Sequence, residues 1–449
     1  MTSPKSETLN APRAVVVGAG PVGCLAAQVL ARHGYAVEVY EKRPHYVEHG
    51  LRHDGRTINL SLSPRGVAAL AGAGTATSTA GGVRDFAELA RLAVPMRRRV
   101  RHEPYGRTGV VPYGSDDRQN LSVDRNDLNL HLMKGAEAAP AVRFVFDAEC
   151  GEVDFTARRV TFTGPAGRTF EVGYDLLVGA DGAHSAVRGR LAAQGLTRVE
   201  QRAAGAEYRE ITLVPAKAPG GQEHFDPGAI HVWPRDGFFM VGLPNLDGSL
   251  RCTLVLPGDD GTGAADRDTA ATAATTFADL AAEDALGDFL RRHFPDAAAH
   301  HRPARTGAAR SPVSSISLVT CDPVVHGDSV LLMGDAAHTL APFLGQGVNL
   351  GLEDCAALDR LLFAHRGERA AVLARFQQER VPEHEAAAAL SLANYRELNG
   401  TGPAPRSAGA ASLPTLVNFL SSSYREALDA YAGARHAVAA DPLPHPIGR

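Results

Sequence analysis

The stretch AVVVGAGPVG at residues 14–23 constrains the fold of this chain more than any other feature. A short β-branched run leads into a G-x-G-x-x-G spacing and then into an alanine-rich helical pattern, which predicts a strand, a tight turn and a helix. Gly18 would permit the turn, Gly20 would let a pyrophosphate approach the backbone, and Gly23 would allow the helix to pack closely on the strand. The sequence therefore predicts an α/β domain that binds a dinucleotide.

A second predicted strand supports this interpretation. The run AVEVY (36–40) ends at Glu41, where a carboxylate can accept hydrogen bonds from ribose hydroxyls. Because Glu41 would repel a 2'-phosphate, the site suits FAD or NAD better than NADP. Arg43, two residues further on, is also a predicted cofactor contact.

Composition narrows the class of protein. The chain has 449 residues, a net charge of -4 and five scattered cysteines with no C-x-x-C pair. This length allows two or three packed units, and the weak charge gives no general attraction to nucleic acid. The cysteine pattern argues against a disulfide framework or a zinc site, and no stretch approaches the ~18 apolar residues that span a bilayer. Together with a polar N-terminus, these features predict a cytoplasmic protein without a metal, a membrane or a nucleic-acid partner.

Two later segments place a Gly-Asp or Asp-Gly pair after a buried strand. In YDLLVGADGAHSAVRGRL the strand runs into Asp181 and Gly182. In SVLLMGDAAHTLAPFLGQGVNLGLEDC a second strand runs into Asp335. Taken singly, each could be an ordinary strand-to-helix turn. Asp335 could also accept from a ribityl hydroxyl of a flavin, and the following helix start could direct N–H groups at the flavin edge that becomes negative on reduction. The predicted contacts in this loop are Pro342, Gly345, Gln346, Gly347, Val348 and Asn349.

Together these motifs resemble the DG and GD motifs of the single-component FAD-dependent aromatic hydroxylases, the p-hydroxybenzoate hydroxylase class. Within that class the chain is similar to the kynurenine 3-monooxygenases, from residue 14 to about 398. The similar segments are GRTINLSLSPRG, LSVDRNDLN, EYREITL, HVWPRDGFFMVGLPNLDGSLRCTLVLP and DFLRRHFPDA.

The resemblance implies FAD as the bound cofactor and NADPH or NADH as a co-substrate that docks transiently, since no second complete Rossmann unit follows. It implies that Arg125 contacts the cofactor and that Asp181 and Gly182 lie where the flavin and nicotinamide sites meet. The expected fold is α/β, with a Rossmann-type FAD-binding domain, an inserted antiparallel β-sheet substrate domain and C-terminal helices. The expected bounds are 1–75, 120–200 and 322–380 for the FAD-binding domain, 76–119 and 201–321 for the substrate domain, and 381–449 for the helical region.

The basic run MRRRVR (96–101) has two interpretations. By itself such a run is usually a solvated edge or an anion patch. If it forms a strand, Arg99 lies on one face and Arg98 on the other. The hydroxylases that the chain resembles carry MRxRMIH followed by xIPYG, where an arginine and a tyrosine hold the carboxylate of an amino-acid substrate. The matching residues here are Arg99 and Tyr113, which could supply a guanidinium and a phenol to a carboxylate.

Further substrate contacts are expected from the same resemblance. The segment NYREL matches NYxEM, so Asn394 would add a carboxylate contact and Glu397 an amine contact or a position behind the substrate. Phe238 and Met240 are candidates for the aryl pocket, although the segment 201–257 would by itself give both an ordinary packing role in an antiparallel sheet.

Two positions depart from the family pattern. Leu344 stands where an aromatic or polar ring is common, and Pro414 takes the place of a substrate-binding tyrosine when the chains are aligned on YREAL. His338 in GDAAH is expected to be a structural hydrogen-bonding histidine rather than an acid–base catalyst. The two departures leave the substrate open.

Three hypotheses for function remain, with a small aromatic amino-acid-like substrate, NAD(P)H and O2 as the expected partners and the oligomeric state left open. The first is hydroxylation of L-kynurenine or a close analogue, ortho to the amine, through a C4a-hydroperoxyflavin. The second keeps the chemistry for an aminohydroxybenzoate or anthranilate-type substrate, or N-oxygenates an aryl amine. The third is a non-catalytic flavoprotein that senses redox state. Nucleic-acid binding through MRRRVR is disfavoured, because aromatic interleaving and a reading helix are missing.

Overall fold

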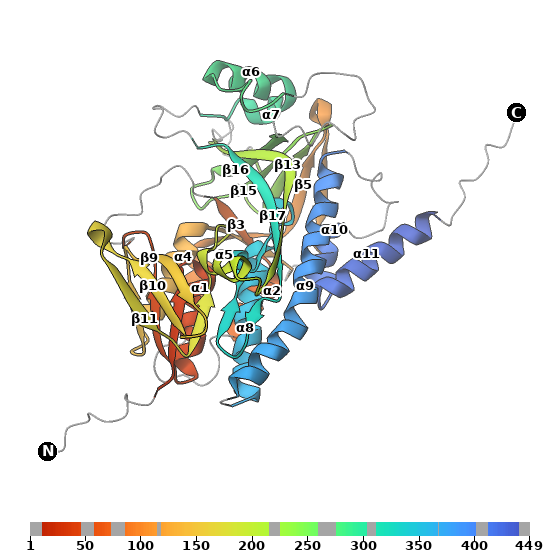
Figure 1. The fold of residues 1–449 in the computed structure, drawn as a ribbon. Coiled ribbons are helices and arrows are strands. Elements are labelled where there is room, and N and C mark those ends of the chain that lie inside the picture. Colours follow the sequence, from red (N-terminus) through yellow and green to blue (C-terminus); the bar gives the residue numbers. More distant parts are fainter. Residues whose placement is uncertain are drawn as a thin grey trace, which may run out of the picture.

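The computed structural model combines a layered α/β part with a large, mainly antiparallel sheet, and a long C-terminal helix, α9 (Arg369–Leu398), contacts both (Figure 1). The described residues are 11–45, 58–72, 86–114, 118–214, 225–258, 275–302, 311–366, 368–400 and 412–439. The expected α/β fold with an inserted antiparallel sheet and C-terminal helices is confirmed.

A six-stranded sheet forms the centre of the α/β part, in the order β18-β19-β12-β1-β2-β8. Its neighbours pair in parallel except β18 with β19. Parallel strands are covered on both faces and therefore read as continuous apolar runs, as β1 does, where Ala14 to Val17 are at most 4% exposed. The strands are β1 (Arg13–Val17), β2 (Ala36–Tyr40), β8 (Val142–Val145), β12 (Leu176–Gly179), β18 (Val325–His326) and β19 (Val330–Leu332).

Helix α1 (Pro21–Arg32) packs against both α4 (Arg125–Glu137) and α8 (Gly347–Ala364) beside this sheet. Proline suits the first position of α1 because the N–H that it lacks would have no partner in a first helical turn. Two three-stranded antiparallel sheets flank this layer. They contain β9 (Glu149–Asp154), β10 (Arg159–Thr163) and β11 (Thr169–Gly173), and β3 (Asn59–Leu62), β7 (Asn120–Asp124) and β4 (Ala93–Met96).

The eight-stranded sheet has the order β20-β17-β13-β16-β15-β14-β5-β6. Its pairs are antiparallel except β14 with β5, so the basic run joins the sheet as a strand. The domain bounds proposed above stay a prediction. The strands are β5 (Arg98–His102), β6 (Thr108–Pro112), β13 (Arg198–Leu213), β14 (Ala229–Pro234), β15 (Phe239–Pro244), β16 (Leu250–Pro257), β17 (Ser314–Asp322) and β20 (His338–Thr339).

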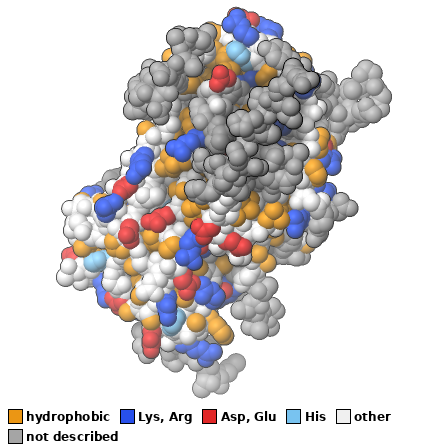
Figure 2. Space-filling model, turned by 90° about the vertical axis from the view of Figure 1, so that its right-hand side faces the viewer, with side chains coloured by type: hydrophobic (Ala, Val, Ile, Leu, Met, Phe, Trp, Pro, Cys, Tyr) orange, Lys and Arg blue, Asp and Glu red, His pale blue; other side chains and the backbone are white. Residues whose placement is uncertain are grey.

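The remaining helices are distributed along the chain, and the last two follow α9. Those of the described chain are α2 (Pro64–Gly72), α3 (Phe86–Arg91), α5 (Ala186–Ala193), α6 (Glu283–His293), α7 (Pro295–Ala298), α10 (Leu413–Thr415) and α11 (Tyr424–Ala439). Among the described residues, no helix combines the length and the apolar character that crossing a bilayer requires. On the face drawn in Figure 2, cationic and anionic side chains are interspersed rather than gathered by sign.

A buried ionic cluster ties α8 and α9 to the GD turn. Asp354 accepts hydrogen bonds from Arg380 at 2.7 Å and bonds the imidazoles of His338 at 2.7 Å and His384 at 2.9 Å. His338 is fully buried and does not line the cavity described below. This placement supports the structural role predicted for His338.

Candidate active site

The glycine turn between β1 and α1 has the geometry that its sequence predicts. Gly18 has φ +101°, and a Cβ there would lie 2.4 Å from the carbonyl oxygen of Ala180. A Cβ on Gly23 would lie 2.0 Å from the carbonyl oxygen of Gly18. A Cβ on Gly20 would meet no atom within 4 Å, so the backbone at the start of α1 is open to an approaching anion. Gly18 and Gly23 thus fit the predicted turn and close packing, and the approach of a pyrophosphate at Gly20 stays a prediction.

Glu41 lies at the end of β2 and fastens this turn. Its Oε2 accepts from the backbone N–H of Ala19 at 2.9 Å, and its Oε1 accepts from the backbone N–H and Nε of Arg43 at 3.0 and 2.8 Å. Burial by itself would raise the pKa of Glu41, but the bonds and charge of Arg43 outweigh it and hold the pKa below its ordinary value. Glu41 is therefore an ionised acceptor at the position predicted for ribose, with Arg43 as its counter-ion.

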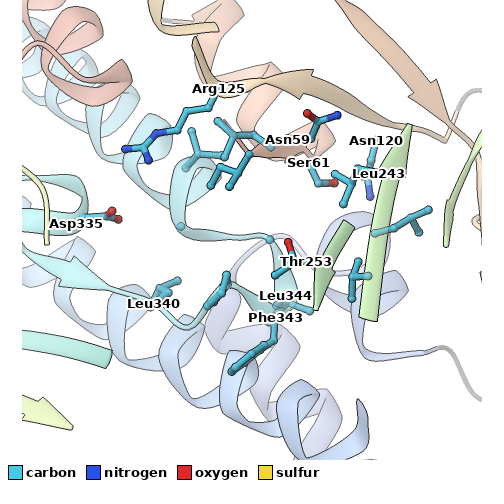
Figure 3. Close-up of a pocket in the computed structure, with 18 of the residues that line it drawn as sticks. Asn59, Ser61, Asn120, Arg125, Leu243, Thr253, Asp335, Leu340, Phe343 and Leu344 are labelled. Atoms are coloured by element: carbon cyan, nitrogen blue, oxygen red, sulfur yellow. The ribbon is translucent and has the colours of Figure 1, made fainter. Parts of the chain in front are cut away.

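A cavity of about 290 Å³ extends from the glycine turn to the eight-stranded sheet. Figure 3 shows Arg125 and Asp335 at one end, Asn120 and Leu243 at the other, and Ser61 and Thr253 between them. Of the predicted residues, the cavity wall contains Gly20, Arg99, Tyr113, Arg125, Gly182, Asp335, Pro342, Gly345, Gly347 and Val348. Segments far apart in the chain therefore meet in one space.

The loop before α8 forms one wall. Gly345 has φ +66°, a backbone conformation that suits glycine, and Gly347 begins α8. Two of the predicted contacts support this loop from behind and do not line the cavity. Buried Asn349 accepts from the Ser63 N–H and donates to the carbonyls of Ser61 and Gly345. Gln346 donates to the carbonyl of Leu344 and to Asn418, and accepts from the hydroxyl of Tyr424.

The DG turn carries a carboxylate that accepts hydrogen bonds at the start of α5. Asp181 Oδ2 accepts from the backbone N–H groups of Ala186 at 2.6 Å and Val187 at 3.3 Å, at the start of α5. Its buried Oδ1 has no hydrogen-bond partner within the described residues, and burial raises the pKa of Asp181. Gly182, with φ +81°, reaches the cavity.

These residues fit FAD. The open backbone at Gly20 and the start of α1 would hold the pyrophosphate, and Glu41 would hold the ribose. Asp335 is exposed within the cavity wall and would accept from the ribityl chain. The start of α8 would present its positive dipole end to the flavin.

Arg99 and Tyr113 lie at the sheet end of the same cavity. Burial lowers the pKa of the Arg99 guanidinium, against the opposing effects of Tyr113 and Glu397. Tyr113 is buried with its ring 4.9 Å from that of Phe419, and burial raises the pKa of its phenol, to which Asn120 donates a hydrogen bond. The other arginines of the run are placed differently: Arg98 pairs with Asp226 and Arg101 with Glu103, while Arg97 precedes β5 and is exposed.

Asn394 and Glu397 lie behind the cavity wall rather than in it. Asn394 is 1% exposed and donates to the carbonyl of Phe343 at 2.7 Å, so it braces a residue that does line the cavity. Glu397 accepts from the hydroxyl of Tyr431 at 3.1 Å, and its charge acts on Arg99. Direct carboxylate or amine contacts by these two residues stay predictions.

The structure does not bring Phe238 and Met240 to the cavity. Phe238 packs against the rings of Phe289 and Phe294, and Met240 lies in the same apolar cluster on the opposite face of the sheet. The cavity wall instead contains Phe239, Val241 and Leu243 of β15. The prediction of Phe238 and Met240 is therefore wrong, because the cavity lies on the other face of this strand. Both faces of β15 are apolar, so its hydrophobic pattern could not choose between them.

Sequence reasoning also missed Glu210 of β13, which lines the cavity and is 6% exposed. The available signal was an acidic residue within a segment predicted as strand. The two departures from the family pattern do face the cavity, since Leu344 and Pro414 both line it.

Comparison with known proteins supplies the family. Residues 12–391 match the family model described as FAD binding domain. The chain is 39% identical over 388 residues to kynurenine 3-monooxygenase of Salinispora tropica, covering 86% of this chain and 80% of that protein. It is 35% identical to the Myxococcus xanthus protein of the same name, covering 87% and 79%, and 32% identical to that of Sus scrofa, covering 85% and 75%.

Solved structures share the fold at lower identity. The tetrameric form of 2-methyl-3-hydroxypyridine-5-carboxylic acid oxygenase has a TM-score of 0.65 at 20% identity, covering 91% of this chain and 95% of that one. PqsL, a probable FAD-dependent monooxygenase from Pseudomonas aeruginosa, has a TM-score of 0.65 at 21% identity, covering 87% and 98%. The family match and the identity to these relatives show that this chain belongs to the kynurenine 3-monooxygenase family of FAD-dependent aromatic hydroxylases.

Proposed function

We propose that this protein uses FAD, NAD(P)H and O2 to hydroxylate L-kynurenine or a close analogue, ortho to the ring amine. The observation that carries the proposal is that Arg99 lines the same cavity as Gly20, Asp335 and Gly347. A cation for the substrate carboxylate and the residues that fit FAD thus share one space. The curated relatives are named kynurenine 3-monooxygenase, which supports the choice of substrate.

The side chains of the sheet end would hold and orient the substrate. Arg99 would give paired N–H donors to the carboxylate, and Tyr113 would add a phenol beside it. Phe239, Val241 and Leu243 would bury the aromatic ring. These contacts would fix which edge of the ring faces the start of α8.

FAD, when bound and reduced by NAD(P)H, supplies the activation of O2 and the transfer of one oxygen atom. The protein's part is to close the cavity against water and to keep the ring in place. Asn349 and Gln346 would contribute by holding the loop before α8, because both bond backbone or side-chain groups behind it. Transient docking of the nicotinamide near Asp181 and Gly182 remains part of the proposal.

A second candidate substrate is a smaller amino-aryl acid, such as an aminohydroxybenzoate or anthranilate. Leu344 and Pro414 favour it, because both departures from the family pattern line the cavity. Pro414 has no hydroxyl with which to bind a carboxylate, so the cavity offers one hydrogen-bond donor fewer to a long substrate.

The test is substrate-stimulated oxidation of NADPH and NADH by the FAD-loaded protein. L-kynurenine, anthranilate and an aminohydroxybenzoate are compared, and products are identified by mass. We expect stimulation by L-kynurenine and a product heavier by one oxygen atom. Stimulation by the smaller acids alone would select the second substrate class, whereas no stimulation by any amino-aryl acid would favour a redox-sensing flavoprotein without hydroxylase activity.

A further inference from the structure

Glu210 is a buried carboxylate in the wall of the proposed substrate cavity. It lies on β13, where it pairs with Thr253 of β16, and the Thr253 hydroxyl donates to Oε1 at 2.6 Å. The buried Oε2 has no hydrogen-bond partner within the part of the chain that the structure describes. One oxygen is thus held in place while the other remains free to accept.

Such an arrangement is costly for folding and therefore points to a ligand. A buried carboxylate oxygen without a partner loses its hydration and gains nothing in return. Burial raises the pKa of Glu210 to about 7, with the Thr253 bond and the charge of Arg251 opposing the rise. Arg251 itself donates to Thr212 rather than to Glu210. Perturbed carboxyls in clefts are candidates for contact with substrate.

The position of Glu210 relative to Arg99 defines the shape of a fitting ligand. The two residues lie on strands four steps apart, in the order β13-β16-β15-β14-β5, which corresponds to about 19 Å between backbones. The wall between them is formed by Val241, Leu243 and Ile230. A fitting ligand has an anionic end for Arg99, an apolar middle and a hydrogen-bond donor at its far end.

The far end is the end nearer the proposed flavin position. In Figure 3, Thr253 lies between the two ends of the cavity, close to the loop that carries Leu344, whereas Asn120 and Leu243 lie further along. Because the Thr253 hydroxyl holds the Glu210 carboxylate, we assign Glu210 to the part of the cavity nearer this loop.

We propose that Glu210 accepts a hydrogen bond from the aryl amine of the substrate while Arg99 binds its carboxylate. This inference rests on the proposed function and names the residue that binds the ring amine. An amine would pair the free oxygen, whereas a ring that carries only hydrogen there would leave it unpaired. Sites built to bond a donor discriminate strongly against analogues that lack it. The same contact would set the ring rotation and so the position that is hydroxylated.

The experiment compares two ligands on the FAD-loaded full chain. They are L-kynurenine and its analogue without the ring amine, each titrated against the change in flavin absorbance. In Glu210→Gln, the Thr253 hydroxyl would keep the amide oxygen and leave an NH2 facing the substrate amine, donor against donor. We expect L-kynurenine to bind roughly 10-fold or more weakly and the analogue less than about 2-fold more weakly. Glu207→Gln is the matched control, because Glu207 lies on the same strand and does not line the cavity.

If Glu210→Gln lost equal affinity for the two ligands, or lost affinity for neither, the assignment of Glu210 would be overturned and the proposed function would stand. Failure of the wild-type holoprotein to bind L-kynurenine would overturn both. Thr253→Val is the second variant, since it removes the hydroxyl that positions the carboxylate. It should also weaken L-kynurenine more than the analogue, and thermal melting verifies that each variant is folded.

Discussion

Arg99 and Glu210 place opposite charges in one largely apolar cavity wall. Glu210 is buried and Arg99 is half-buried, and burial shifts the pKa of each toward its neutral form. Their neighbours in the chain are solvated or paired elsewhere, as Arg98 is with Asp226. We therefore expect substrate binding at this site to depend on Arg99 and Glu210 rather than on their charged neighbours in the chain.

Arg99→Ala should raise KM for a carboxylate substrate by roughly 10- to 100-fold or more, because each charge-assisted hydrogen bond contributes about 1.5–3 kcal/mol. FAD content should not change, since Arg99 lies at the end of the cavity away from the glycine turn. Arg101→Ala, whose guanidinium pairs with Glu103, is the control. Unchanged kinetics in Arg99→Ala would show that Arg99 does not bind the substrate and would leave the whole basic run with a surface role only.

Glu210 should make stability depend on pH. Because burial raises its folded pKa from 4.5 to about 7, the folded state binds the proton more tightly, and stability is lost as pH rises from 4.5 through 7. Glu210→Gln should therefore be more stable than the wild type at pH 8, by on the order of 3 kcal/mol. The difference should vanish near pH 4.5. Denaturant unfolding of both proteins at the two pH values tests this, and a difference that does not change with pH would contradict it.

At the scale of elements, the turn between β1 and α1 separates two demands on glycine. A Cβ on Gly23 would collide with the backbone of Gly18, whereas a Cβ on Gly20 would meet open space. Packing of the helix on the turn requires glycine at position 23, and we expect the approach of a ligand to require glycine at position 20. We therefore expect the same strand–turn–helix element to contribute to stability through Gly23 and to cofactor binding through Gly20.

Gly23→Ala should destabilise the protein by several kcal/mol, because the helix must move away from the turn. Gly20→Ala should melt within a few degrees of the wild type, since its φ of -73° suits alanine, yet should bind FAD at least about 10-fold more weakly. Thermal unfolding and FAD titration measure the two effects separately. Normal FAD binding by Gly20→Ala would argue against the pyrophosphate position.

At the scale of the whole molecule, the site exists only where three parts of the chain meet. The glycine turn, the loop before α8 and the eight-stranded sheet each supply part of the cavity wall. Asp354 joins the GD turn to α9 through His338 and His384. This buried cluster lies outside the cavity and holds the turn that contributes Asp335 to the cavity wall.

Acid should weaken this junction. Burial lowers the pKa of His384 to about 4, with the nearby His338 adding to the effect and Asp354 opposing it. The unfolded chain then binds more protons, so stability falls as pH drops from about 6.5 to about 4, by on the order of 3 kcal/mol from this residue. Unfolding of the wild type and of His384→Asn at pH 7 and pH 5 tests this. The variant should lose less stability between these values, and an equal loss would exclude His384 as a source.

The sequence by itself determined the βαβ unit and the glycine positions of its turn, because these depend on local spacing and steric rules. It also predicted that Arg99 and Tyr113 share one site, and both line the same cavity. Only the tertiary structure decided which face of β15 forms the cavity, since apolar side chains occupy both faces and alternation alone is symmetric. It also decided that Asn349 and Asn394 brace the wall and that Glu210 is buried beside Thr253. Burial and hydrogen bonding between distant segments arise from strand pairing and helix packing, which no local pattern encodes.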